Sequence, residues 1–293
     1  MHAVANSDHR AFCHILVATD FSPASHAAVL QAAWFARLYE SSLVIAHILP
    51  SDAPPAATQQ AWREGQRLET ELMVSGKTRG LKCKLVVGSG EIWEGLSRMV
   101  AEFNVDLIVV GTRGRTGLAR VLLGSVAERI FRRATCPVLT MGPGIARLGV
   151  EEPAIRRVLY PTGFAAHSLH AFPYAISLAR KCKAHLTLLH AVPDLSGEAV
   201  PSKEARLEAA REQLRALVPA DAGLVDEPDI VVGFGTPANR ILAVAGEQSA
   251  DLIVLGLRQP EATSSGRRWT IASEITGKAG CGVLTVRAPA GVD

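Results

Sequence analysis

The sequence predicts an α/β protein built from two tandem, doubly wound parallel sheets of five strands each. Short, unbroken apolar runs rich in Val, Ile and Leu alternate with helical stretches, and such runs are typical of parallel strands buried on both faces. The pattern also recurs: residues 15–21 are echoed by 158–164 at an offset of 143, and 106–111 by 251–256 at an offset of 145. Two further pairs of segments repeat in the same order: 43–47 with 186–190, and 136–140 with 281–285. Four ordered matches indicate a tandem duplication.

Length and composition fit this prediction and exclude several classes of protein. The 293 residues suit two domains of about 150 residues each. The net charge of +3 is too small for a nucleic-acid coat or a polybasic membrane anchor, and 48% hydrophobic with 20% charged residues is ordinary for a globular chain. Five scattered cysteines without a Cys-x-x-Cys pair argue against a disulfide framework or a cysteine metal site. Without a signal-peptide pattern or an apolar run of about 18 residues, we expect a soluble, cytoplasmic protein.

The strands are expected where the buried apolar runs fall, in the same order in both copies. In the first copy they are expected near 14–19, 42–48, 83–88, 106–111 and 137–141, and in the second near 156–161, 185–191, 229–233, 251–256 and 282–286. Helices between successive strands require right-handed crossovers, which give a doubly wound sheet.

The helices are expected between these strands. Ser22 can cap the first helix and Pro23 fits its first turn, where a missing N–H costs nothing. The later helices are expected within 56–78, from about 91 to 103, from Ser125 onward and, most clearly, from 202 to 217 in the second copy. The Gly- and Pro-rich stretch at 142–153 reads as the connection between the copies.

One glycine-rich segment favours anion binding. It runs from Gly111 to Gly117, closes with Gly124, Ser125 and Val126, and lies between a buried strand and a helix. Glycines let the backbone approach a ligand closely, and the first N–H groups of a helix attract anions. Arg113 and Arg115 add positive charge. The segment is neither a Walker A loop nor a Gly-x-Gly-x-x-Gly fingerprint, and the plain alternative is an ordinary turn.

The spacing of these glycines resembles a known signature. Gly111-x-x-Gly114, nine residues and then Gly124-Ser125 is similar to the nucleotide-binding signature of the universal stress protein family, and Thr19-Asp20-Phe21-Ser22 resembles the first strand and turn of that family. The similarity extends over 12–143, a nucleotide-binding domain, and 155–288, a degenerate one. It implies a Rossmann-like sheet in the order 3-2-1-4-5. It also implies that the fifth strands of the two copies pair with one another, and that the protein forms a homodimer.

The resemblance further implies which residues bind ATP, together with Mg²⁺, in the first domain. Ala18, Thr19, Asp20 and Ile48 would surround adenosine, and the ribose and phosphates would be held by Gly111, Arg113, Gly114, Gly124, Ser125 and Val126. The strand order reverses between the first and fourth strands, where open α/β sheets bind ligands. Asp20 has an alternative role as a turn or cap residue beside Ser22.

The second copy has lost most of these residues. Gly163 stands at the position of Asp20, Gln259 at that of Gly114 and Trp269 at that of Gly124; Gly256, Arg258 and the hydroxyl of Thr270 remain. A tryptophan would occupy the place where backbone must touch phosphate. The sequence therefore predicts that the second domain binds no ATP and is structural or partner-binding.

No residue pattern predicts an enzyme. The nine histidines show no metal-ligand spacing, and neither a nucleophile elbow nor a Walker B acid is present. His47 and His190 occupy equivalent strand ends, which favours a shared packing role. Glu128 lies one helical turn after Ser125, where a surface charge that favours the helix start fits as well as a general base does. Together with the resemblance, this predicts a stress-response or regulatory ATP-binding protein with no metal site of its own. An interaction module without nucleotide, a slow ATPase and an adenylating ligase are the alternatives.

Overall fold

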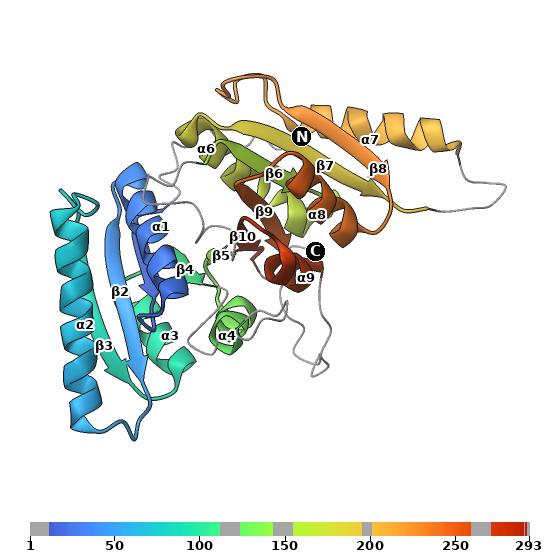
Figure 1. The fold of residues 1–293 in the computed structure, drawn as a ribbon. Helices are drawn as coiled ribbons and strands as arrows, with labels where there is room; N and C mark the ends of the chain where they lie inside the picture. Colours follow the sequence, from blue (N-terminus) through green and yellow to red (C-terminus); the bar gives the residue numbers. More distant parts are fainter. Residues whose placement is uncertain are drawn as a thin grey trace.

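The structure, a computed structural model, describes residues 12–111, 124–142, 155–194, 201–258, 271–289 and 291. Strands and helices alternate in both halves (Figure 1). The first half contains β1 (His14–Ala18), α1 (Pro23–Tyr39), β2 (Ser42–Leu49), α2 (Pro55–Val74), β3 (Cys83–Ser89), α3 (Ile92–Glu102), β4 (Leu107–Gly111), α4 (Ser125–Arg133) and β5 (Val138–Met141). The second contains β6 (Arg157–Pro161), α5 (Ala166–Leu169), α6 (Phe172–Cys182), β7 (His185–Val192), α7 (Lys203–Leu217), β8 (Asp229–Phe234), α8 (Pro237–Glu247), β9 (Leu252–Leu257), α9 (Ile271–Lys278) and β10 (Gly282–Arg287). The predicted α/β fold is confirmed.

The strands form a single sheet of ten, in the order β3-β2-β1-β4-β5-β10-β9-β6-β7-β8. Within each half the pairing is parallel, and both halves follow the order 3-2-1-4-5. The two predicted five-stranded sheets are joined edge to edge, because β5 and β10 pair antiparallel with Leu139 opposite Leu284. The hydroxyls of Thr140 and Thr285 reinforce this junction, since each donates to a strand carbonyl of the other half at 3.1 Å. The expected pairing of the fifth strands within one chain is thereby confirmed.

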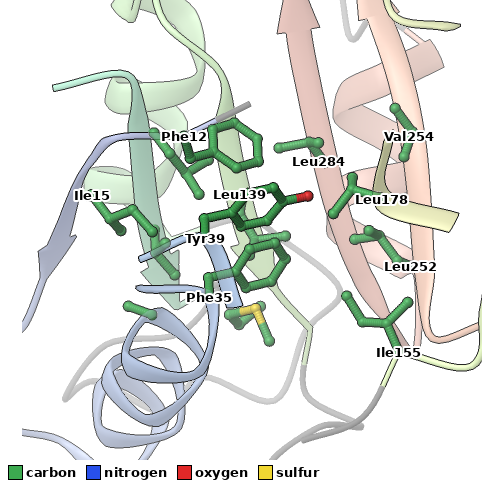
Figure 2. Packing of buried hydrophobic residues seen from close by; sticks show 14 of the residues in the cluster. Phe12, Ile15, Phe35, Tyr39, Leu139, Ile155, Leu178, Leu252, Val254 and Leu284 are labelled. Carbon is green, nitrogen blue, oxygen red and sulfur yellow. The ribbon is translucent and has the colours of Figure 1, made fainter. Parts of the chain in front are cut away.

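Two hydrophobic clusters cover the opposite faces of the sheet and run through both halves. One lies under α1, α2, α6 and α7, and the other under α3, α4, α8 and α9. Figure 2 shows the first at the junction, where Phe12, Phe35 and Tyr39 of the first half lie beside Leu178 and Leu284 of the second. The rings of Phe12 and Tyr39 meet edge to face with centroids 5.1 Å apart. The two halves therefore share one core on each face.

The first helix differs between the two halves. Helix α1 is continuous over 17 residues, and Ser22 caps it as predicted by accepting a hydrogen bond from the Ser25 N–H at 3.2 Å. In the second half the corresponding segment is divided into α5 and α6. Pro173 stands where α1 has Leu30; its ring has no N–H and clashes with the carbonyl four residues earlier, so α5 ends at Leu169. Among the described helices, none is long and apolar enough to span a membrane.

Candidate functional site

A cavity of about 150 Å³ lies at the carboxyl ends of β1 and β4, where the strand order of the first half reverses. Eight of the ten predicted site residues line it; Arg113 and Gly114 lie outside the described residues. The eight come from four segments: Ala18, Thr19 and Asp20; Ile48; Gly111; and Gly124, Ser125 and Val126. The structure therefore brings together every predicted site residue that it describes.

The turn after β1 forms one wall of the cavity and is held by a closed set of hydrogen bonds. The hydroxyls of Thr19 and Ser25 lie 3.0 Å apart, and Thr19 also accepts from the Phe21 N–H at 3.0 Å. Phe21 adopts a left-handed φ of 60°, a conformation uncommon for an aromatic residue. Asp20 accepts from the Ser22 N–H at 3.0 Å, so it shapes the turn and lines the cavity at once.

His47 fixes this turn from the neighbouring strand. Its Nδ1–H donates to the carbonyl of Thr19 at 2.7 Å, and its ring lies against Phe21 with centroids 4.6 Å apart. The second half repeats the arrangement: His190 donates to the carbonyl of Thr162 at 2.8 Å and lies 4.6 Å from the ring of Phe164. The shared packing role predicted for the two histidines is confirmed.

Part of the cavity lining is an apolar wall. It is formed by Ile48, with Ile92 and Leu96 from the first two turns of α3. Ile48 fits because Gly95 has no side chain: a Cβ there would lie 2.8 Å from the Ile48 Cδ1 atom. The wall is suited to a flat, apolar-faced ring such as a nucleobase.

Helix α4 forms the polar end of the cavity. It begins at Ser125, and its N-cap is Gly124, which has no side chain to occupy the first backbone N–H groups. These N–H groups and the Ser125 hydroxyl are donors that an oxyanion needs, at the positive end of the helix dipole. Glu128 is not among the lining residues; it pairs with Arg132 at 2.9 Å, as expected of a surface charge.

Helices α3 and α4 are tied together beside the cavity. Glu91, the N-cap of α3, accepts from the Glu94 N–H at 2.9 Å and forms an ion pair with Arg129 of α4. The backbone hydrogen bond from Glu94 and the guanidinium of Arg129 lower the pKa of Glu91. Because the side chains of Arg129 and Glu91 are 54% and 34% exposed, the pair fixes orientation more than it adds stability.

Sequence reasoning missed several lining residues, among them Ser25, His47, Ile92, Leu96 and Ala127. Two of them carried a readable signal. Ser25 lies three residues after the cap Ser22, on the same face of the helix, and His47 precedes the predicted Ile48 on β2. Ile92 and Leu96 could not be found, because only the packing of α3 on β2 shows which helix face meets the cavity.

The corresponding region of the second half is built differently. Gly256, the counterpart of Gly111, is covered by helix α5, since a Cβ there would lie 2.2 Å from the carbonyl oxygen of His167. Arg240 stands where α3 has Gly95, and its guanidinium covers Gly233. Gly163 leaves the turn without a carboxylate, while Gln259, Trp269 and Thr270 lie outside the described residues. Along the described parts of the chain, no three His, Cys, Asp or Glu side chains gather as metal ligands.

Comparison with known proteins shows that both halves match the same protein family. The model of the universal stress protein family matches residues 11–141 and 154–287. A universal stress protein of Mycobacterium tuberculosis is 27% identical over 258 residues, covering 83% of this chain and 86% of the relative. One from Methanocaldococcus jannaschii is 28% identical over 152 residues, covering 48% of this chain and 88% of the relative.

Solved structures agree on the fold. The crystal structure of a universal stress protein from Archaeoglobus fulgidus matches 94% of this chain and 98% of its own, with a TM-score of 0.68 and 21% identity. At that identity the match shows a shared arrangement of strands and helices across both halves.

Proposed function

The chain belongs to the universal stress protein family, a family of stress-response proteins, and from that membership we propose that the crevice of its first half binds ATP. Binding would serve regulation rather than turnover: occupancy would bias the conformation or assembly of the protein. The observation that carries the proposal is the convergence of eight predicted residues, from four separate segments, on one cavity at the reversal of strand order.

The chemistry of the cavity supports an adenine nucleotide in one orientation. The apolar wall of Ile48, Ile92 and Leu96 suits the adenine ring, and the turn at Thr19 and Asp20 offers polar groups to the nucleoside. The uncapped start of α4 then faces the phosphates. Mg²⁺ would accompany the triphosphate, with phosphate oxygens and water as its main ligands, as this ion commonly binds.

We further propose that the second half binds no ATP and is structural or partner-binding. Three differences support this: Gly163 supplies no carboxylate, the backbone of α5 covers Gly256, and the guanidinium of Arg240 lies against Gly233 where the first half has Ile48 against Gly88. The three differences affect different parts of the site, so a substitution that reverses one of them would not by itself create ATP binding.

Calorimetric titration of the full chain with ATP, ADP and AMP tests the proposal. We expect the wild type to bind ATP, and Gly124→Trp to abolish binding because the indole would cover the start of α4. Gly246→Trp is the matched control, since Gly246 is exposed on α8 with open space around it. A wild type that binds none of the nucleotides would contradict the proposal and favour an interaction module. Steady phosphate release that is lost in Gly124→Trp would instead indicate an ATPase.

A further inference from the structure

We propose that Arg287, at the end of β10 in the second half, positions helix α4 of the first half for phosphate binding. The second half would then set the affinity of the first for ATP through one side chain. This inference rests on the proposed function and adds a residue that lies outside the cavity.

Arg287 reaches across the junction between the halves and binds the C-terminal end of α4. Its Nε–H donates to the carbonyl of Ala134 at 3.1 Å, and Nη2 donates to that of Phe131 at 2.9 Å. Nη1 donates to the carbonyl of Arg258 at 2.7 Å, in the second half. A single guanidinium thus joins the last turn of α4 to the residue that follows β9.

These contacts supply hydrogen-bond donors to the C-terminal carbonyls of α4. The last carbonyls of a helix have no partner within it and carry the negative end of its dipole, so a cation placed there is favourable. Ala134 is the residue that ends α4, and a fork of N–H donors can hold two carbonyls in a fixed geometry. Arg287 therefore fixes where α4 ends and how its axis points.

Both ends of α4 move together. Nine residues span only about 13 Å at 1.5 Å per residue. Residues Gly124 to Ala127 at the start of the helix line the cavity, while Ile130 and Phe131 are buried in the core beneath it. A tilt set at the Arg287 end therefore moves the backbone N–H groups that would meet phosphate.

The duplicated half provides an internal comparison. The position equivalent to Arg287 in the first half is Gly142, at the same offset of 145 residues that relates β4 to β9. A Cβ on Gly142 would lie 2.7 Å from the carbonyl oxygen of Cys281 and 2.8 Å from that of Ala279, just after α9. Of these two equivalent positions, Arg287 contacts the end of α4, the helix that lines the cavity, whereas Gly142 packs its backbone against the segment that follows α9 in the second half.

The test compares ATP with adenosine, which lacks phosphates, on the full chain. Arg287→Met keeps the aliphatic stem but removes the donors, and Arg287→Lys keeps the charge but not the fork. Arg157→Met is the matched control, because Arg157 likewise donates to a helix-end carbonyl, that of Gln248, but within the second half. We expect Arg287→Met to weaken ATP binding about tenfold, within the range of couplings carried by residues remote from a ligand, and Arg287→Lys to weaken it less. Adenosine binding should be unchanged in both variants, and Arg157→Met should change neither ligand.

The outcomes separate the inference from the proposed function. If the wild type binds ATP and Arg287→Met binds it equally well, the inference is wrong and the proposed function stands. An equal loss of ATP and adenosine binding would make Arg287 merely a structural residue, which also overturns the inference. A wild type that binds no ATP refutes the proposed function and the inference with it. If Arg287→Met does not fold, Arg287→Lys decides: faster amide hydrogen exchange in α4 with selective loss of ATP affinity supports the positioning role, and unchanged ATP affinity overturns it.

Discussion

Replacement of Gly95 by alanine tests how the apolar wall is built. The added methyl would lie 2.8 Å from the Cδ1 atom of Ile48 and 3.3 Å from its Cγ1 and Cγ2 atoms, so the Ile48 side chain must move. Glycine to alanine inside a helix gains up to about 1 kcal/mol of intrinsic helix stability, whereas overpacking costs about 1–3 kcal/mol. We therefore expect Gly95→Ala to lower the free energy of unfolding by about 0–2 kcal/mol.

Chemical denaturation measures this effect, and Gly246→Ala provides the control. Gly246 lies on α8, and a Cβ added to it would meet no atom within 4 Å, so alanine there should stabilise the protein by up to about 1 kcal/mol. The difference between the two substitutions isolates the steric cost at Ile48. ATP affinity should fall in Gly95→Ala and remain unchanged in Gly246→Ala. Equal stabilisation by both, with unchanged ATP affinity, would refute this account of the wall.

Three further predictions concern the junction, a surface histidine and a buried thiol. Leu139→Ala should lower the free energy of unfolding by about 2–5 kcal/mol in urea titrations, because Leu139 is buried where β5 meets β10. Partial burial lowers the pKa of His185, but its hydrogen bonds to Asp226 and Asp229 outweigh burial and raise it above 6.5. The stabilisation that protonated His185 gains from these two carboxylates should be complete below about pH 6.5 and lost as the pH rises through the folded pKa. The free energies of unfolding of the wild type and His185→Asn should therefore converge at high pH. Burial raises the pKa of Cys281 to about 12, and its thiol should react with disulfide reagents at pH 8 only after denaturation.

Much of the fold could be predicted because each buried strand of a parallel sheet is an unbroken run of apolar residues in the sequence. Each of the ten expected strands is present, with its ends shifted by at most one residue. The joining of two sheets into one could not be read from periodicity, since an edge strand and an interior strand such as β5 have the same apolar pattern. It followed only from the expected pairing of the fifth strands.

The site was predictable where one short segment carries several of its residues, and unpredictable where packing decides. Nearby sequence indicates both segments: the turn at Thr19 and Asp20 follows the end of a strand, and α4 begins at Ser125 directly after a glycine. The effect of Pro173 was missed: the helix break at Leu169 goes with α5 lying over Gly256, a contact between residues far apart in sequence. Arg287 was missed for the same reason, since nothing near it in sequence indicates the end of α4.

The second half fills the space beside its third strand with a different side chain from the first half. Ile48 and Gly88 face one another in register on β2 and β3, and the side chain of Ile48 fills the space left by the glycine. In the second half Ala191 faces Gly233, and the guanidinium of Arg240 fills the space instead. A large side chain on the strand and a glycine on the helix have thus exchanged for a small side chain on the strand and an arginine on the helix.

Such an exchange keeps this space filled, which explains how the second half can remain packed there without an isoleucine. The second half also covers an edge of the first, because β10 pairs with β5, whose unpaired backbone would otherwise be open to another chain. Arg287 lies on that same strand. Selection for a covered edge would therefore retain β10 after the second crevice had changed, and with it the side chain that we propose tunes the first.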